Sequence, residues 1–232
     1  MSYPDPQVRH AVSHSRIIKI TAPGPEAVDD LLRVETQAWD ADGENLEASR
    51  DKIIRRIQSF PEGIILATLY GESHEKGDPA GSQYTFRCQW NGDPASLGSW
   101  DTHTADGWTD TVHCPDGNTG FLVGVGVVPE YRQYLFHHNF LVHTHPLRIS
   151  ELLIAVALNN LFQLGVGQII GNARIPGYHL RPDLAVDDYC NLRREDGKLS
   201  DPVLRFHERM GAEILKPVPY SMEDPESRNA GC

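Results

Sequence analysis

Histidine is the residue type in this chain best suited to acid–base chemistry near neutral pH. Among its 11 histidines, His179 ends the segment NARIPGYH, just after a stretch expected to form a strand over 168–173. An imidazole at the end of a strand can act as a general acid or base. It can equally be a loop histidine that is hydrogen-bonded to the backbone, and the sequence leaves both interpretations open.

A cluster of four histidines lies earlier in the chain. It consists of His137, His138, His143 and His145, and the last two would project to one side of an extended segment, as pairs of metal ligands can. No carboxylate or cysteine nearby completes a ligand set, so we expect a polar loop and no metal site. The four cysteines form no CxxC pair, and nothing around them indicates an activated thiol.

The elements that must position these residues can be read from apolar periodicity, caps and turn residues. They are expected in this order: strand 16–20, helix 25–39, helix 47–59, strand 63–70, strand 83–90, strand 121–128, helix 146–164, strand 168–173, helix 186–193, helix 201–211 and strand 213–218. Antiparallel strands come first and β-α-β units later. This order predicts an α/β fold with one mixed, twisted sheet of six to seven strands and helices on both faces.

Some stretches carry more specific expectations. The segment 91–120 is polar and too long for a hairpin turn, so we expect it to form a loop. Two glycines inside the strand 121–128 predict a bulge or a close approach of a ligand to the backbone. Asp201 as N-cap, Pro202 at the first helical position and Gly211 after the end predict a short, well-capped helix.

Composition excludes several classes of protein. The formal net charge is −11, from 21 basic and 32 acidic residues, which argues against sequence-independent binding of nucleic acid and against an anionic membrane surface. No apolar run approaches the ~18 residues needed to span a bilayer, and the N-terminus lacks the apolar core of a signal peptide. We expect a soluble cytoplasmic protein with a loose arm over 1–15 and a single catalytic domain over 16–232.

Five motifs make the chain resemble a known superfamily. They are FPEGIILAT from Phe60, SWDTHTADGW from Ser99, VGVVPEYR ending at Arg132, NARIPGYH ending at His179, and DPVLRFHERMGAEI from Asp201. In this order they resemble the Gcn5-related acyltransferase (GNAT) superfamily. Similar segments occur in GNAT domains fused to nitrilase-like hydrolases and in GNAT-like loading domains of polyketide synthases.

The resemblance implies a V-shaped slot beside the central strand, which the pantetheine arm of coenzyme A enters. The strand over 121–128 would bind the arm through its backbone, with Val125, Val127 and Val128 as contacts. The next helix would point its N-terminus at the pyrophosphate, because unpaired N–H groups and the helix dipole favour anions there.

The chain departs from the superfamily where the phosphate loop is expected. GNAT enzymes usually have Arg/Gln-x-x-Gly-x-Gly/Ala after the strand, whereas Arg132 and Gln133 are followed by YLFHHNFLVHTHPLR, without glycine. Arg132, Arg148 and the helix amides can still meet a phosphate, but less tightly. The polyketide-loading branch shows a similar departure, and its donor can be an acyl carrier protein, so this branch is favoured.

The same branch implies roles for four side chains. His179 would be the catalytic acid or base. Thr144 would hold the thioester oxygen, although its hydroxyl can also cap the following helix. Arg194 would pair with a substrate carboxylate through its two-pronged guanidinium, unless the neighbouring Arg193 takes this place. Trp39 would line the acyl pocket, although it can equally be an ordinary core residue.

Three functions follow as hypotheses. The first is an acyl-thioester enzyme acting on acyl-coenzyme A or an acyl carrier protein, by malonyl decarboxylation, acyl transfer or both, in polyketide initiation. The second is an N-acetyltransferase that acts on a small amine. The third is a GNAT-like domain that binds acyl-coenzyme A without turnover.

The last residues carry an expectation of their own. GNAT domains usually close the sheet with a seventh strand, but the polar segment SMEDPESRNAGC after Pro219 leaves no apolar stretch for it. We therefore expect that the chain is a piece of a longer protein or a truncated member, whose exposed edge pairs with other residues.

Overall fold

The computed structural model of the chain describes residues 9–13, 16–39, 46–71, 76–138 and 145–232. They form two compact units within the stretch that the sequence assigned to one domain. The first unit comprises Met1–Gln89 and Trp108–Ile169, and the second comprises Trp90–Gly107 and Ile170–Cys232. Each unit is described by itself below.

The strands run, in chain order, as β1 (Arg9–Ser13), β2 (Arg16–Thr21), β3 (Ile64–Tyr70), β4 (Asp78–Cys88), β5 (Thr119–Val127), β6 (Leu135–His138), β7 (Leu147–Arg148) and β8 (Gln168–Gly171). Their order in the sheet is β7-β6-β1-β2-β3-β4-β5-β8. Each neighbouring pair from β1 to β5 is antiparallel, and β6 is antiparallel to both β1 and β7.

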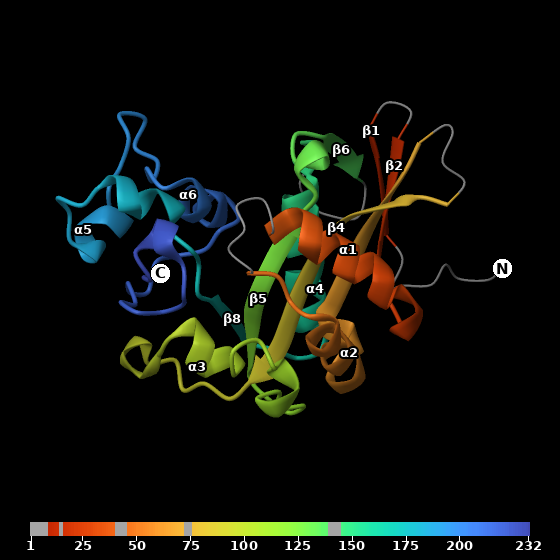
Figure 1. The fold of residues 1–232 in the computed structure, drawn as a ribbon, viewed down its shortest axis with the longest axis horizontal. Helices are drawn as coiled ribbons and strands as arrows, with labels where there is room; N and C mark the ends of the chain where they lie inside the picture. The colour runs from red at the N-terminus through yellow and green to blue at the C-terminus, as the bar shows by residue number, and fades with distance from the viewer. Residues whose placement is uncertain (1–8, 14–15, 40–45, 72–75, 139–144) are drawn as a thin grey trace. The chain divides into compact units, whose positions relative to one another are not determined.

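The helices are α1 (Val28–Trp39), α2 (Arg50–Ser59), α3 (Trp100–Thr104), α4 (Ile149–Gln163), α5 (Val186–Cys190) and α6 (Pro202–Arg209). Helices α1 and α4 cover opposite faces of the sheet (Figure 1). The expected fold class, a mixed α/β sheet with helices on both faces, is therefore confirmed, although the described residues form a sheet of eight strands instead of the six to seven expected.

One hydrophobic cluster of the first unit lies between α4 and the sheet. Ile149, Leu152 and Leu153 of α4 are fully buried, and they pack against Ile18 and Ile20 of β2 within one cluster. Burying such a side chain contributes about 1.5–3 kcal/mol. The apolar residues that recur at helical spacing in the sequence are therefore the ones that α4 buries against the sheet.

Helix caps formed where the sequence predicted them. The Asp201 carboxylate accepts hydrogen bonds from the backbone N–H groups of Val203 (2.8 Å) and Leu204 (3.0 Å). Gly211, after the end of α6, has φ +91°, a conformation that glycine adopts without steric cost. Gly165 ends α4 in the same way, with φ +82°.

Three strands were not expected: β1, which lies within the expected N-terminal arm, β6, and the two-residue β7, which lies at the start of the expected helix 146–164. Arg9–Ser13 forms β1, because the edge of β2 offers backbone partners to residues that would otherwise have only water. Leu135–His138 forms β6 beside β1. The polar stretch 91–120 was expected as a loop but contains α3, which begins after the N-cap Ser99.

The strand predicted over 213–218 was wrong. Val218 makes only an isolated bridge, to Gly231, and Gly231 also bridges Arg174. Pro217 and Pro219 flank Val218 and lack the N–H donors that a strand needs. The last residues of the chain thus lie between the 218 and 174 segments, where they make bridges rather than a full strand.

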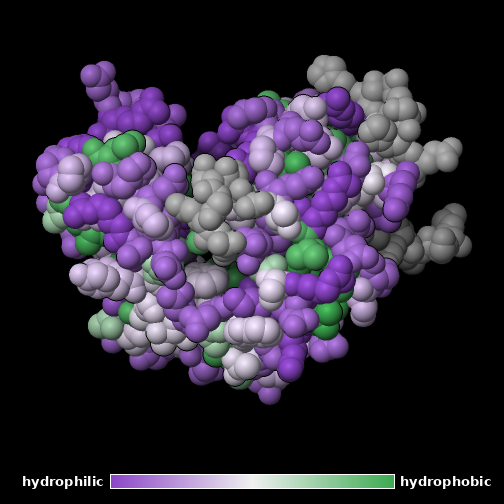
Figure 2. Space-filling view, in the orientation of Figure 1, coloured by the Kyte–Doolittle hydropathy of each residue, from purple (hydrophilic) through white to green (hydrophobic). Residues whose placement is uncertain are grey.

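The face drawn in Figure 2 is mainly hydrophilic, and hydrophobic residues appear on it in small separate groups. This agrees with the net charge of −11. Among the described residues, no helix is both long enough and apolar enough to cross a membrane.

Candidate active site

Strand β5, on which the resemblance places the pantetheine arm, contains a bulge. Tyr84 of β4 is paired with Gly124, whereas Thr85 is paired with Leu122, so Val123 is an extra residue on β5. A bulge bends its strand and increases the local twist. The irregularity predicted from the two glycines is therefore present.

The three valines predicted to contact the cofactor have different surroundings. Val127 is part of the core on the α4 side, and Val125 packs against that core. The backbone N–H of Val128 donates to the Ala80 carbonyl at 3.0 Å. A pantetheine arm at these residues must therefore use backbone groups other than the Val128 N–H.

The opposite face of β5 is a glycine surface covered by Trp39. Because side chains alternate along a strand, Gly124 and Gly126 face α1, away from the valines. A Cβ atom added at Gly126 would lie 3.1 Å from both Ala38 Cβ and Trp39 Nε1, and one at Gly124 would lie 3.9 Å from Trp39 Cζ2. The half-buried indole thus lies directly against the glycine surface.

Arg132 connects the end of β5 to the end of α1. Its Nε donates to the Val127 carbonyl at 3.0 Å, and its Nη2 donates to the Ala38 carbonyl at 3.1 Å. A cation is favourable at the C-terminus of a helix, where carbonyl groups have no helical partner. The guanidinium therefore has a structural role at this position, beside the phosphate contact that the resemblance implied.

Arg148 lies at the N-cap of α4, where a phosphate site was expected. Its backbone N–H donates to Glu151 Oε2 at 2.7 Å, and Glu151 is only 7% exposed. A carboxylate in the first turn already complements the helix dipole. The protein therefore supplies part of the negative charge that a cofactor phosphate would bring to this helix end.

A buried polar cluster beneath α1 was not predicted as a site. Glu35 is 4% exposed; its Oε2 accepts from Ala48 N–H at 2.9 Å, and its Oε1 lies 3.5 Å from Ser82 Oγ. Burial raises the pKa of Glu35, against the opposing effects of the Ala48 N–H and the Arg56 charge. Burial likewise holds the pKa of the Tyr84 hydroxyl well above its ordinary value. The sequence signal was a glutamate at helical spacing within the apolar stripe of α1.

In the second unit, His179 lies in a short 3₁₀ helix, Pro176–Leu180. Its Nδ1 lies 2.7 Å from the Pro176 carbonyl oxygen and 2.9 Å from the Glu226 carbonyl oxygen. The side chain is exposed. The backbone contacts expected of a loop histidine are therefore present, and they leave Nε2 as the outer nitrogen.

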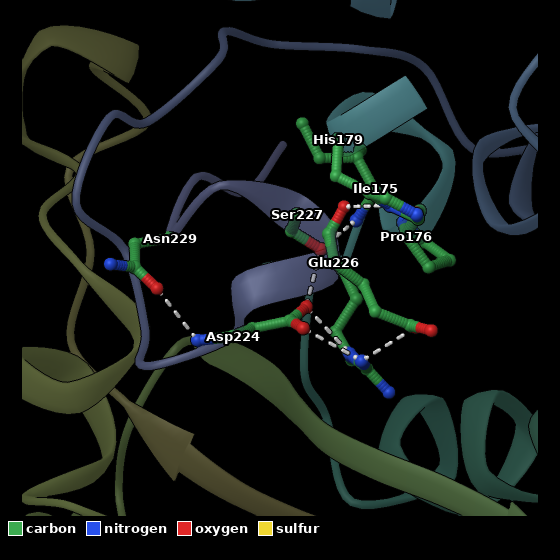
Figure 3. A network of polar contacts seen from close by, with 8 residues as sticks. Ile175, Pro176, His179, Asp224, Glu226, Ser227 and Asn229 are labelled. Atoms are coloured by element: carbon green, nitrogen blue, oxygen red, sulfur yellow. Dashed lines mark hydrogen bonds and ion pairs between the residues drawn. The ribbon is translucent and has the colours of Figure 1, made fainter. Parts of the chain in front are cut away.

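A network of polar contacts surrounds the segment that carries the Glu226 carbonyl (Figure 3). Arg174 donates from Nε and Nη2 to the two oxygens of Asp224, at 2.7 and 2.8 Å. The Asp224 side chain is fully buried, and the Ser227 hydroxyl donates to it. Burial opposes ionisation of Asp224, but the hydrogen bonds from Arg174 and Ser227 outweigh it and lower the pKa of this carboxyl.

Arg194 lies on an exposed turn of the second unit. Its side chain is 53% exposed, and its Nε lies 3.7 Å from Asp196. Arg193 next to it bonds the Gly197 carbonyl and Glu208. Both guanidinium groups thus contact an acidic side chain of the protein, and either would have to exchange that contact for a substrate carboxylate.

The remaining predicted positions are Thr144, the histidine cluster and the cysteines. Thr144 lies outside the described residues, as does His143 of the histidine cluster. Within the described part of the chain, no group of three or more His, Cys, Asp or Glu side chains is arranged to hold a metal ion. All four cysteines are free thiols, and burial raises the pKa of Cys88 to about 11.

The structure therefore brings some predicted residues together within each unit. In the first unit, Trp39, β5 and Arg132 meet around the end of α1. In the second, His179 is held by Pro176 and Glu226, while Arg194 belongs to a separate turn.

Comparison with known proteins bears on the fold and on the superfamily resemblance. No protein-family profile matches the chain. YkwB, an uncharacterized N-acetyltransferase of Bacillus subtilis (strain 168), is 29% identical over 188 residues, which cover 79% of this chain and 72% of that protein.

Two solved structures resemble the whole chain. The loading GNATL domain of CurA from Lyngbya majuscula superposes with a TM-score of 0.71 at 23% identity, covering 92% of this chain and 94% of that one. The GphF GNAT-like decarboxylase in complex with isobutyryl-CoA superposes with a TM-score of 0.66 at 25% identity, covering 97% and 95%. The chain has the GNAT fold, and the resemblance read from its motifs is confirmed.

Proposed function

We propose that this protein is an acyl-thioester enzyme whose proton-transfer group is His179. The observation that carries the proposal is the contact of His179 Nδ1 with two backbone carbonyl oxygens, at 2.7 and 2.9 Å. A carbonyl oxygen only accepts hydrogen bonds, so Nδ1 carries a hydrogen. In the neutral imidazole Nε2 then has the free lone pair, and the exposed ring can take up or deliver a proton there.

The acyl thioester would be carried on a pantetheine arm bound along β5. The bulge at Val123 and the small Gly124, where an added Cβ would lie 3.9 Å from Trp39, give an extended arm close access to the backbone. Trp39, which lies against Gly124 and Gly126, would form an apolar wall for the acyl group.

The donor is proposed to be a malonyl or related thioester, which loses carbon dioxide before or instead of acyl transfer. Arg194 would hold the free carboxylate through its guanidinium, and Thr144 would hold the thioester oxygen as charge develops. The imidazolium form of His179, protonated on both nitrogens, would then donate its Nε2 proton to the carbanion that remains when the C–C bond breaks and carbon dioxide leaves. The solved neighbour described as a GNAT-like decarboxylase, 25% identical over 97% of this chain, supports this proposal.

An acyl carrier protein is proposed as the source of the thioester. Glu151 already complements the N-terminus of α4, and no glycine follows Arg132 to form the usual phosphate loop. A carrier-bound pantetheine has one phosphate, attached to a serine, and lacks the pyrophosphate of coenzyme A. A thioester on a carrier protein therefore depends less on anion binding at the N-terminus of α4.

The test is to incubate the protein with malonyl- and acetyl-coenzyme A, with and without a carrier protein, and to identify products by mass. Decarboxylated or transferred acyl groups are expected from malonyl donors. His179→Ala should lower turnover at least tenfold, since an acid–base group contributes ~10²–10⁴-fold. The control is His137→Ala, an exposed histidine of β6, which should retain activity. Equal turnover in both variants would remove His179 from the mechanism.

A second candidate is an N-acetyltransferase, which the 29% identity to YkwB favours. His179 would then accept a proton from the substrate's ammonium group; the neutral amine would attack the thioester carbonyl, and the C–S bond would break to release the thiol of the donor. Acetylated amine in the same mass assay, without decarboxylation of the malonyl donor, would select this function. Binding of acyl-coenzyme A without any product would instead indicate a domain that binds and does not catalyse.

A further inference from the structure

The two carbonyl groups that contact His179 come from distant parts of the chain. Pro176 precedes His179 by three residues, whereas Glu226 follows it by 47. Both oxygens approach the same ring nitrogen (Figure 3). The local turn supplies one acceptor, so the second depends on how the segment around Glu226 is held.

One buried ion pair joins that segment to the residues before His179. Asp224 precedes the 3₁₀ turn Pro225–Ser227, and its side chain is fully buried. Arg174 donates hydrogen bonds to both carboxylate oxygens of Asp224, and such a bidentate ion pair is both strong and fixed in geometry. Arg174 lies directly before the turn that carries His179. The pair therefore joins the two segments that supply the carbonyl groups.

Ser227 links the ion pair to the backbone just before the His179 turn. Its hydroxyl donates to Asp224 and accepts from the Ile175 N–H at 3.0 Å. The backbone N–H of Asp224 in turn donates to Asn229 Oδ1 at 2.9 Å. Hence the position of the Glu226 carbonyl depends on Asp224, Arg174 and Ser227 together.

We propose that Arg174, Asp224 and Ser227 are positioning residues that hold His179 with its hydrogen on Nδ1 and present Nε2 as the reacting nitrogen. This inference rests on the proposed role of His179, but its structural half concerns the tautomer alone. An imidazole released into water favours the hydrogen on Nε2. Loss of the Glu226 carbonyl would leave the Pro176 carbonyl as the one acceptor at Nδ1, so the preference for hydrogen on Nδ1 would weaken and the Nε2–H tautomer, which lacks the free lone pair on Nε2, would gain.

The tautomer can be read by long-range ¹H–¹⁵N correlation spectra of protein with ¹⁵N-labelled histidine. Spectra are recorded at about pH 8.5, well above the ordinary histidine pKa of about 6.5, and the His179 signals are assigned by their loss in His179→Gln. In the wild type we expect hydrogen on Nδ1. In Asp224→Asn and in the milder Ser227→Ala we expect a mixture in which Nε2–H gains. Circular dichroism identifies any variant that fails to fold, and Ser227→Ala then decides the outcome.

The matched control is Asp183→Asn in the same unit. Asp183 is also gripped by an arginine through both oxygens, Arg181 at 3.1 and 3.0 Å, but it is exposed and does not contact His179. It should leave the tautomer and turnover unchanged. A wild type with hydrogen on Nε2, or an Asp224→Asn variant with an unchanged tautomer, would overturn the proposal.

Kinetics separate this inference from the proposed function. Asp224→Asn should lower kcat at least about tenfold with little change in KM, because substrate binding is intact and proton transfer is not. If His179→Ala keeps full turnover, the catalytic role of His179 fails whatever its tautomer. If His179→Ala is inactive while Asp224→Asn shifts the tautomer and keeps kcat, the role of His179 stands and the positioning proposal falls.

Discussion

The glycine surface of β5 allows a paired experiment in which two methyl groups, two residues apart, should have opposite effects. Neither Gly124 nor Gly126 has a positive φ, so alanine meets no backbone strain at either position. Gly→Ala at a compatible position stabilises by about 0.4–1 kcal/mol, because the unfolded chain loses freedom. The surroundings of the new methyl group therefore decide the sign.

At Gly126 the new Cβ would lie 3.1 Å from Ala38 Cβ and from Trp39 Nε1. Ordinary carbon contacts begin at about 3.5 Å, so the end of α1 must move by several tenths of an ångström. Arg132 resists this movement, since it bonds the Ala38 carbonyl at 3.1 Å. Overpacking costs about 1–3 kcal/mol. After the gain from the unfolded state, Gly126→Ala should lower the free energy of unfolding by about 0.5–2 kcal/mol.

At Gly124 the new Cβ has one contact within 4 Å among the described residues, Trp39 Cζ2 at 3.9 Å, which is ordinary van der Waals contact. Gly124→Ala should therefore raise the free energy of unfolding by about 0.5–1 kcal/mol. If the acyl thioester binds on this surface, the same methyl group also occupies its space. We then expect the Kd for acyl-coenzyme A to rise about tenfold, so that stability and binding change in opposite directions.

Urea unfolding followed by circular dichroism measures the stabilities, and calorimetric titration measures binding. Trp39→Phe combined with Gly126→Ala serves as the internal control, because the smaller ring should restore part of the lost stability. Equal stabilities of the two alanine variants would refute the packing argument. Unchanged binding by Gly124→Ala would refute the placement of the acyl thioester on this surface.

Three further predictions follow from individual side chains. Asp224→Asn should lower the free energy of unfolding by about 3–5 kcal/mol at neutral pH. The pKa of Asp224 is lowered from 3.8 in the folded protein, so the difference in stability from wild type should shrink as the pH falls below 3.8 through the folded-state pKa. Urea titrations at several pH values measure this difference. Arg194→Ala should cost about 2–5 kcal/mol in kcat/KM for a malonyl donor and little for an acetyl donor; equal losses would direct the same test to Arg193. Arg132→Met should lower stability by about 1–3 kcal/mol through loss of two charge-assisted hydrogen bonds. If Arg132 also binds a phosphate of coenzyme A, the KM of the Arg132→Met variant for acyl-coenzyme A should rise. Its KM for an acyl-pantetheine, which lacks phosphate, should not change.

Local patterns were sufficient for most helices and strands of the chain. The cap Asp201-Pro202, with Gly211 after the end, defined α6 because each residue acts on backbone groups at most a few positions away. Gly124 and Gly126 of β5 likewise predicted the irregularity that is seen as a bulge. The superfamily resemblance added the slot and its candidate residues, which no periodicity could supply.

Pairing over long distances was beyond the reach of such patterns. The 213–218 stretch looked like a strand by its composition, but its neighbours and its prolines allowed only a bridge from Val218 to Gly231. Arg9–Ser13 looked like part of a loose arm, yet it pairs with β2 and β6. In both cases the partner, rather than the segment itself, decided whether a strand formed.

The sequence by itself determined that the chain has a GNAT-like order of elements, an acidic surface and a histidine suited to proton transfer. Only the tertiary structure decided how that chemistry is held. His179 Nδ1 contacts a carbonyl oxygen 47 residues away, and Arg132 is bonded to the end of a helix 94 residues before it. Hydrogen bonds of this kind depend on distance in space, and a residue's neighbours along the chain do not specify which distant group the fold will bring within 3 Å.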